Sequence, residues 1–263
     1  MTKSSISAIV LTRESEGVIE DCLKSLTWVN QIVVVDSGSK DKTIKIAEKY
    51  GAKFVISKED GFSEKRNKGA EEVTEEWLLY IDSDERVTPQ LRNEISKLIS
   101  NFQFPISNVV AYAIPRKNII LGREMKHGGW WPDYVKRLFL KSKFKRWKGE
   151  LHEEPQFEGE LGHLESPLVH LKHDNLSDMV DKTNEWSEIE ARLMYKAGHP
   201  NMNVARFLSA MTREFWLRMV KYRAFLDGAE GIMYAFYQVY SRFISYAKLW
   251  EKQLQAKSSK LKA

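Results

Sequence analysis

The chain has 263 residues, of which 43% are hydrophobic and 29% charged. This length suits one large domain, or a core domain with an appendage, that needs no cross-links. A single cysteine, Cys22, excludes an internal disulfide framework and fits a reducing compartment. No uncharged apolar stretch reaches about 18 residues, and residues 1–5 lack the apolar core of a signal peptide. We therefore expect a cytoplasmic protein without a spanning helix.

Positive charge is concentrated in the last quarter of the chain. The formal net charge is +5, from 41 Lys and Arg against 36 Asp and Glu. Residues 200–263 hold 11 of the basic and 4 of the acidic side chains, so the other residues hold 30 and 32. Aromatic and aliphatic residues are interleaved with the C-terminal basic residues at helical spacing. This pattern favours an anionic membrane surface over nucleic acid as a partner.

Apolar runs and helical patterns alternate over the first hundred residues. The runs predict strands, and the patterns between them predict helices. The strands are expected over 6–11, 32–35, 52–56 and 77–81, and the helices over 18–26, up to about 50, over 62–73, and from Thr88-Pro89 onward. Thr88 suits an N-cap and Pro89 the first helical position. This alternation predicts an α/β fold with a mostly parallel central sheet flanked by helices.

The pattern changes in the second half of the chain. Longer strands are expected over 109–120 and 135–140, with a loop rich in Gly and Trp over 122–133 between them. Apolar stripes at helical spacing begin at Leu176. We expect a core domain over 1–175, with halves of about 1–105 and 106–175, and a C-terminal helical appendage over 176–254. The Lys and Ser content of 255–263 predicts a disordered tail.

Asp82-Ser83-Asp84 follows directly after the apolar run 77–81. The end of a buried strand lies at the carboxyl edge of the sheet, where open α/β sheets bind ligands. Two carboxylates there suit a divalent cation that holds a diphosphate. An alternative is that Asp82 or Ser83 caps the helix that follows. A calcium EF-hand loop is excluded, because Arg86-Val87 stands where further oxygen ligands and a glycine are needed.

The turn after the first strand argues against dinucleotide binding. A Rossmann fingerprint requires G-x-G-x-x-G at this place, whereas the turn reads Thr12-Arg13-Glu14-Ser15-Glu16-Gly17. These side chains would keep the backbone away from a pyrophosphate. A P-loop is absent as well. The nucleotide chemistry of this chain is therefore of another kind.

Four motifs occur in order over about residues 5–175: Ser7–Thr12, Val34–Thr43, Arg66–Ala70 and Asp82–Asp84. Together they resemble the motifs of family 2 glycosyltransferases, which have the GT-A fold. The resemblance implies that Asp36 contacts the base of a nucleotide sugar, and that Asp82 lies near the ribose. Arg66 would lie near the phosphates, or remain a solvated helix charge. The implied donor-binding residues are Thr12, Glu14, Asp36, Ser37, Arg66, Asp82 and Ser83.

The resemblance also implies a bound Mg²⁺ or Mn²⁺ ion and a catalytic base. Asp84 would hold the metal against the diphosphate, with Asp82 and a late histidine, His170, as further ligands. His173 is the alternative histidine, or His170 is a satisfied core residue. Four of the six histidines fall between 152 and 173, but structural zinc usually requires cysteines or tighter ligand pairs, and neither is present.

The acceptor hydroxyl must lose a proton, so one carboxylate should lie on its side of the site. Glu153, in the segment 149–155, resembles the family's base. Glu150 and Glu154 are close alternatives, and an acidic surface turn is the remaining one. The metal-bound diphosphate leaves unprotonated, so no general acid is required.

The segment His127–Asp133 reads HGGWWPD and is a candidate acceptor site. Gly128 and Gly129 let the backbone approach a ligand, and the indoles of Trp130 and Trp131 can stack on sugar rings or cover the edge of the sheet. With other features of the second half, this segment resembles the subgroup of bacterial lipopolysaccharide core β-1,4-glucosyltransferases. That resemblance implies inverting transfer from a UDP-sugar, often UDP-glucose, to a lipid-linked inner-core saccharide at the cytoplasmic face of the inner membrane.

Three other functions remain possible at this level. One is a family 2 glycosyltransferase with another donor or acceptor in cell-envelope polysaccharide synthesis. A sugar nucleotidyltransferase could share the fold, but its Gly-rich, Arg-bearing signature after the first strand is missing. A non-catalytic membrane-surface protein could also keep the fold. Release of UDP on adding an acceptor would distinguish an enzyme from the last of these.

Overall fold

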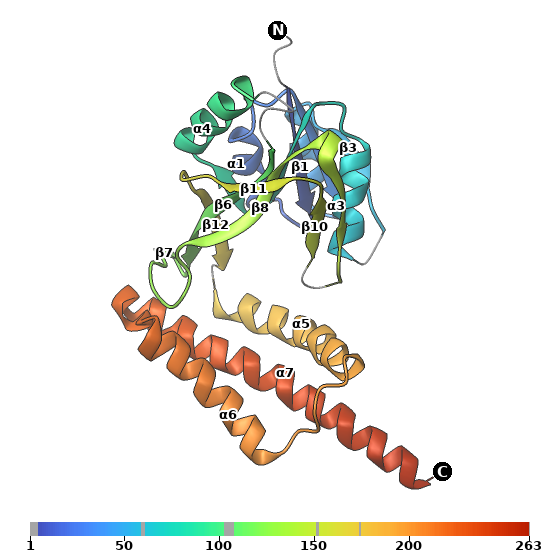
Figure 1. The fold of residues 1–263 in the computed structure, drawn as a ribbon, viewed down its shortest axis with the longest axis vertical. Helices are drawn as coiled ribbons and strands as arrows, with labels where there is room; N and C mark the ends of the chain where they lie inside the picture. The colour runs from blue at the N-terminus through green and yellow to red at the C-terminus, as the bar shows by residue number, and fades with distance from the viewer. Residues whose placement is uncertain (1–4, 59–60, 103–107, 151–152, 174, 263) are drawn as a thin grey trace. The chain divides into compact units, whose positions relative to one another are not determined.

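Four apolar runs of the first hundred residues form neighbouring parallel strands of one sheet (Figure 1). The structure is a computed structural model, and it describes residues 5–58, 61–102, 108–150, 153–173 and 175–262. The strands are β1 (Ile6–Thr12), β2 (Gln31–Asp36), β3 (Lys53–Ile56) and β4 (Trp77–Asp82), in the order β3-β2-β1-β4. Between and after them lie α1 (Ile19–Lys24), α2 (Thr43–Lys49), α3 (Phe62–Glu71) and α4 (Pro89–Ser100). The predicted α/β class is confirmed.

Helices cover both faces of this sheet because successive strand residues point to opposite sides. In β1, Ala8 and Val10 pack with the apolar residues of α1 and α4. Ile9 and Leu11 pack in a second cluster, together with Ala70 at the end of α3 and Trp147. All four β1 residues are buried. This two-sided burial explains why the strand reads as a continuous apolar run rather than an alternating one.

The second half of the sheet is mostly antiparallel. It contains β5 (Glu85–Val87), β6 (Val109–Ile120), β7 (Arg123–Glu124), β8 (Asp133–Leu140), β11 (Glu160–His163) and β12 (Leu168–His173), and β9 (Phe144–Lys148) forms a separate hairpin with β10 (Glu154–Phe157). Strand β8 runs antiparallel to both β4 and β6. The sequence predicts β6 and most of β8, but it gives no assignment for the short strands between 144 and 173.

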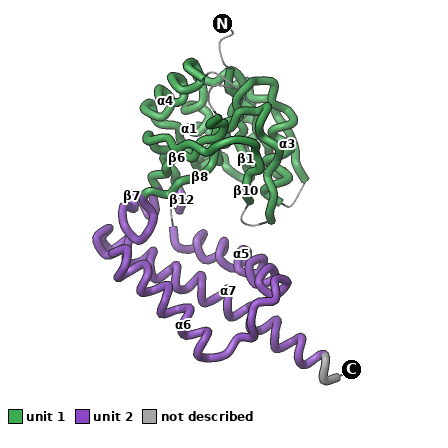
Figure 2. The backbone as a smooth tube through the Cα atoms, viewed as in Figure 1, with its two compact units in different colours: residues 1–117, 132–171 green, residues 118–131, 172–263 purple. Residues whose placement is uncertain are grey.

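The chain divides into two compact units, which Figure 2 colours separately. Unit 1 comprises residues 1–117 and 132–171, and unit 2 comprises residues 118–131 and 172–263. The loop over 118–131 therefore belongs with the C-terminal helices, whereas the sequence places it in the core domain. Its backbone bonds explain this, since the amide of Leu121 donates to the carbonyl of His173 and that of Gly128 to the carbonyl of Tyr222.

Unit 2 is built from helices joined by irregular turns. They are α5 (Leu176–Lys196), α6 (Val204–Phe215), the π-helical turn η2 (Trp216–Lys221), the 3₁₀ turn η3 (Ala224–Asp227) and α7 (Gly228–Lys262). Asn175 and Asn203 cap α5 and α6 through their side chains. Helix α7 continues through residue 262, where the sequence predicts a disordered tail. Within the described ranges, no helix combines the length and apolarity needed to cross a bilayer.

Helix α3 lies close on the sheet at Gly69. A Cβ atom at this position would lie 2.5 Å from Cγ2 of Ile9 and 3.0 Å from Cγ2 of Val35. Such distances are closer than van der Waals contact, so any side chain here would push the helix away from β1 and β2. Gly69 lies three residues after Arg66, and the close approach therefore sets the position of that arginine.

Gly69→Ala should destabilise unit 1. Overpacking costs about 1–3 kcal/mol, which exceeds the gain of at most about 1 kcal/mol from replacing glycine in a helix interior. We expect urea unfolding to show a lower free energy of unfolding for this variant. Gly17→Ala is the control, because a Cβ at Gly17 would meet no atom within 4 Å. Equal stability of the two variants would contradict the close packing of α3.

Candidate active site

Three parallel strands bring polar residues to one edge of the sheet. Thr12, Asp36 and Asp82 are the last residues of β1, β2 and β4. In the register of the sheet, Thr12 is opposite Asp36, and Leu11 is opposite Asp82. Because parallel strands end at the same side, the three residues share the carboxyl edge, where α/β sheets bind ligands. The sequence predicts a carboxylate at this edge after the run 77–81, and Asp82 lies there.

Asp36 shapes the turn that follows β2. Its Oδ2 accepts hydrogen bonds of 2.7 Å from the amides of Gly38 and Ser39, and its Oδ1 accepts a short bond from Oγ of Ser39. The same serine Oγ accepts from the amide of Glu14, 2.8 Å away, and Oε1 of Glu14 accepts from the amide of Lys40. The turns after β1 and β2 are thus tied together around a buried carboxylate.

Three further residues of the expected donor set lie beside these turns. Oγ1 of Thr12 is buried and has no hydrogen-bond partner within the described part of the chain. Ser37 follows Asp36 directly, and its amide donates to the carbonyl of Thr12. Ser83 lies within 3.0 Å of Ser15, hydroxyl to hydroxyl. A buried hydroxyl without a partner is costly in a protein interior, so Thr12 is poised for a ligand polar atom.

Arg66 connects two carboxylates. It is 4% exposed, which excludes the alternative of a solvated helix charge. Its Nη2 donates to Oδ1 of Asp82 at 3.0 Å, and its Nε donates to Oε1 of Glu153 at 3.2 Å. Its guanidinium also lies 5.0 Å from the ring centre of Trp147. Arg66 therefore joins α3, the end of β4 and the segment before β10.

A second group of charged residues, which the sequence does not assign to the site, supports Asp82 from the other side. Arg137 of β8 contacts Oδ2 of Asp82 and donates to Oε1 of Glu85 at 2.9 Å. Glu85 is fully buried and accepts from the amide of Asp82 at 2.9 Å. Arg116 of β6 lies 3.5 Å from Glu85 and 2.7 Å from Asp133. In the sequence, Arg137-Leu138-Phe139 contributes only to the resemblance to the glucosyltransferase subgroup, and nothing local pairs Arg137 with Asp82.

The charges of this network fix its ionisation. Burial would raise the pKa of Asp82, but the guanidinium groups of Arg137 and Arg66 outweigh it and hold that pKa well below its usual range. Burial would lower the pKa of Arg137, and the carboxylates of Asp82 and Glu85 raise it instead. Burial also raises the pKa of the Cys22 thiol, which excludes it as a thiolate nucleophile at neutral pH. Asp82 is therefore an ionised carboxylate whose two oxygens both face arginines.

Asp84 lies beside His170, the histidine that the sequence analysis names with it as a candidate metal ligand. Oδ2 of Asp84 is 3.5 Å from Nε2 of His170. Strand β12 places the histidine there, because His170 pairs with Glu85 in the register and the amide of Leu171 donates to the carbonyl of Asp84. The side chain of Asp84 is 34% exposed, so a ligand can reach it. The alternative histidine, His173, instead packs against tyrosine rings of unit 2.

The described residues hold no cluster of three or more acidic, histidine or cysteine side chains arranged for a metal ion. Two protein ligands are sufficient for Mg²⁺ or Mn²⁺ where substrate phosphates and water supply the others. A carboxylate oxygen suits both ions, and an imidazole nitrogen can add to it for Mn²⁺, the softer of the two. Asp84 and His170 therefore fit such an ion, whereas the oxygens of Asp82 are held by guanidinium groups.

The three candidate bases differ in their surroundings. Glu153 is bonded to Arg66, and its side chain is 16% exposed. Glu154 is exposed and lies 2.5 Å from Lys136. Glu150 is exposed as well, and residues 151–152 lie outside the described ranges. Of the three, Glu153 is the one placed in the same network as Asp82.

The expected acceptor residues lie in unit 2, where Trp130 is packed rather than free. Its ring centre is 4.5 Å from Nζ of Lys172 and 4.6 Å from the guanidinium of Arg218, and 4.9 Å from the ring of Tyr234. Trp131 is 41% exposed. Gly128 and Gly129 have φ angles of 68° and 84°, which favour glycine.

A buried aspartate holds the same loop. Asp227 is 4% exposed, and its two carboxylate oxygens bind the backbone amide and the ring Nδ1 of His127, both at 2.7 Å. Arg218 donates to the carbonyl of Gly128 at 2.8 Å. The loop is therefore fixed to the turns that precede α7, and Trp131 is the indole that it leaves to solvent.

Known proteins resemble this chain along most of its length. The model of the family described as glycosyl transferase family 2 matches residues 7–157. An uncharacterized glycosyltransferase of Rickettsia conorii is 26% identical, over 96% of this chain and 92% of its own. The lipopolysaccharide core biosynthesis glycosyltransferase LpsC of Rhizobium meliloti is 24% identical, over 74% of each chain.

Two solved structures are also partly similar to this chain. TarS of S. aureus gives a TM-score of 0.46 at 15% identity and covers 86% of this chain and 46% of its own. Glucosyl-3-phosphoglycerate synthase from Mycobacterium tuberculosis, in complex with Mn²⁺, UDP and phosphoglyceric acid, gives a TM-score of 0.48 at 14% identity. This match covers 75% of this chain and 80% of that protein's chain. Because the family model matches more than half of the residues, this chain belongs to glycosyl transferase family 2, as a glycosyltransferase with the GT-A fold.

Proposed function

We propose that this glycosyltransferase transfers a hexose, glucose foremost, from a UDP-sugar to a lipid-linked saccharide such as the inner core of lipopolysaccharide. The observation that carries the proposal is the bridge from Asp82 through Arg66 to Glu153. It joins the strand end expected to face the donor to the carboxylate expected to face the acceptor. The printed name of the Rhizobium meliloti relative supports the acceptor class.

The donor would bind at the carboxyl edge of the sheet. Asp36 holds the turn after β2 at the place where the nucleoside is expected, and the free hydroxyl of Thr12 lies at the same edge. Glu14, Ser37 and Ser83 line the neighbouring turns. In this proposal Asp82 faces the ribose, and Arg66 balances negative charge that develops on the diphosphate.

Asp84 and His170 would hold the divalent ion, as their spacing and chemistry allow. A bound Mg²⁺ or Mn²⁺ would neutralise charge on the leaving diphosphate and so lower the barrier to its departure. Asp82 is the less suitable ligand because both of its oxygens accept from arginines. The protein's contribution is to hold Asp84 just beyond the end of β4, beside His170.

Transfer would proceed in one step with inversion. The acceptor hydroxyl oxygen forms a bond to the anomeric carbon of the sugar while the bond from that carbon to the diphosphate oxygen breaks. Glu153 takes the hydroxyl proton, and UDP leaves as the anion. Arg66 positions Glu153 through its 3.2 Å bond and keeps the carboxylate on the side of Asp82. Gly128, Gly129, Trp130 and Trp131 are the proposed acceptor contacts.

A lipid-linked acceptor requires that the enzyme work at a membrane. The C-terminal excess of basic residues suits an anionic surface, and we propose peripheral binding at the cytoplasmic face of the inner membrane.

Asp84→Ala should remove metal-dependent donor binding. Titration of UDP into the wild type should show tighter binding with Mn²⁺ than without. The variant should lose this gain in affinity. Changing a residue that only supports a metal ligand costs about 10–100-fold in metal affinity, so loss of a direct ligand should cost at least as much. Asp21→Ala, on the exposed surface of α1, is the matched control. If Mn²⁺ tightens UDP binding equally in both variants, Asp84 is not a metal ligand.

Glu153→Gln should keep donor binding and lose transfer. Glutamine can still accept the bond from Arg66, but it cannot take a proton, so the rate of UDP release with acceptor should fall by about 10²–10⁴-fold. Binding of UDP measured by calorimetry should stay within twofold of the wild type, on the order of 0.4 kcal/mol. Glu154→Gln is the control, and it should turn over normally. Normal turnover by Glu153→Gln would refute the assignment of the base.

Asp82→Asn should change how stability depends on pH. The pKa of Asp82 is lower in the folded chain, so its carboxylate stabilises the fold above its unfolded pKa of about 3.9. This contribution is lost as pH falls through the folded pKa. The difference in unfolding free energy between wild type and variant should be constant above about pH 5 and narrow below about pH 4. Urea unfolding from pH 3 to 7 measures it, and a constant difference throughout would contradict the ion pairs.

A further inference from the structure

Unit 2 leaves a row of large apolar side chains exposed along residues 204–226. They include Val204, Leu208, Phe215, Trp216, Val220 and Phe225. Leu208 is 56% exposed and Trp216 54%. Single exposed apolar residues are common, but a contiguous group of this kind marks a surface that is covered in use.

Helix α7 extends this row into a face. Phe236 and Phe243 of α7 are 53% and 42% exposed. Phe236 contacts Phe215 of α6 at a ring-centre distance of 5.6 Å, and Phe243 contacts Phe207 at 5.2 Å. The exposed rows of the two helices therefore meet along their seam. We call the exposed apolar residues of 204–226 and of this side of α7 the α6–α7 face.

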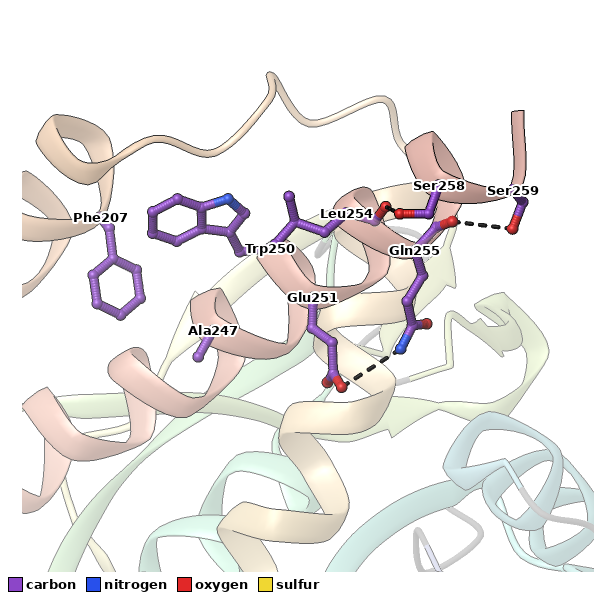
Figure 3. A pocket seen from close by; sticks show the side chains of 8 residues that line it. All are labelled: Phe207, Ala247, Trp250, Glu251, Leu254, Gln255, Ser258 and Ser259. Atoms are coloured by element: carbon purple, nitrogen blue, oxygen red, sulfur yellow. Dashed lines mark hydrogen bonds between the residues drawn. The ribbon is translucent and has the colours of Figure 1, made fainter. Parts of the chain in front are cut away.

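A groove of about 590 Å³ continues the face toward the C-terminus (Figure 3). Phe207 of α6 and Trp250 of α7 form one part of its wall, with ring centres 5.7 Å apart. Leu254, one turn further along α7, also lines the groove and is 53% exposed. Phe207 thus belongs both to the groove and to the seam of the α6–α7 face.

Basic side chains accompany the apolar ones on the same segment. Arg206, Arg213, Lys221 and Arg223 are exposed. The only acidic residue in 204–226 is Glu214. It is buried and paired with Arg218 at 2.9 Å, so its charge is balanced within the fold. The segment therefore combines exposed apolar side chains with exposed basic ones, and its net charge is positive.

This combination distinguishes between two ways to cover the face. In a symmetric pair of copies, the same patch meets itself, so the exposed arginines of one copy would face those of the other. An anionic lipid surface instead offers charges of opposite sign and an apolar interior at once. Basic residues beside Trp, Phe and Leu are the composition of helices that lie in the membrane interface.

We propose that the α6–α7 face binds an anionic lipid surface, with Trp216 and Leu208 entering the boundary between headgroups and acyl chains. Arg206 and Arg213 bind the headgroup phosphates, and the groove beside Trp250 admits an acyl chain. The role of this face rests on the proposed function, because an enzyme that acts on a lipid-linked acceptor must reach it at a membrane. Its physical basis lies wholly within unit 2.

Vesicle flotation tests the proposal without any need for turnover. The full chain is mixed with vesicles of phosphatidylcholine, with or without phosphatidylglycerol as the anionic lipid. The wild type should float with the anionic vesicles only. Trp216→Glu should weaken binding by about tenfold or more, since it removes one large apolar side chain from lipid. Trp186→Glu on α5 is the matched control, because Trp186 is 49% exposed and lies outside the face.

Failure of the wild type to float, or equal loss with Trp186→Glu, would overturn the proposal. Arg206→Gln/Arg213→Gln is a second variant whose side chains are exposed, and it should lose binding as well. Undiminished flotation of this variant would contradict the role of the charges. If size-exclusion light scattering instead shows a dimer that Trp216→Glu dissociates, and no vesicle binding, the face is covered by a second copy and the proposal is wrong. Binding of UDP with Mn²⁺, measured on the same protein, tests the donor site separately.

Discussion

The charged network around the end of β4 is centred on the contact between Arg66 and Asp82. Both oxygens of Asp82 accept from guanidinium groups, Oδ1 from Arg66 and Oδ2 from Arg137. An ion pair removed from water is stable only while all its members are present, because loss of one leaves an uncompensated charge in a low dielectric. The contact therefore requires that α3, β4 and β8 be packed at the same time. Formation of the donor edge and folding of unit 1 are coupled by this requirement.

The sheet and the helices make different contributions to this site. Parallel strands supply the carboxylates, because their ends lie at one edge in a fixed register. The cations come from α3, which packs on the sheet, and from β8 and β6, which continue the sheet beyond β4. Gly69 allows α3 to approach β1 closely enough for Arg66 to reach Asp82. A site built on such elements holds its geometry before any substrate arrives, which is the condition for electrostatic catalysis.

The sequence predicts those parts of the structure that depend on local pattern. The four parallel strands, the cap at Thr88 and the place of Asp82 at the carboxyl edge follow from apolar runs and strand ends. The partners of Asp82 do not, because Arg137 lies 55 positions away and its pairing depends on strand order. A buried arginine in a strand can pair with an acid on any neighbouring strand. For the same reason the packing of Trp130 in unit 2 could not be read from its loop.

The two units meet opposite demands on their polar and apolar residues. Unit 1 buries charged side chains in pairs, which costs desolvation free energy. Charges fixed in this way can stabilise the charge that develops when a diphosphate leaves. Unit 2 exposes aromatic and aliphatic side chains that a protein with only water around it would bury. The soluble donor and the lipid-linked acceptor that we propose would make these demands in one enzyme, since the first needs fixed charges and the second needs an apolar surface. The separate placement of the two surfaces on the chain is therefore a consequence of the substrates that we propose.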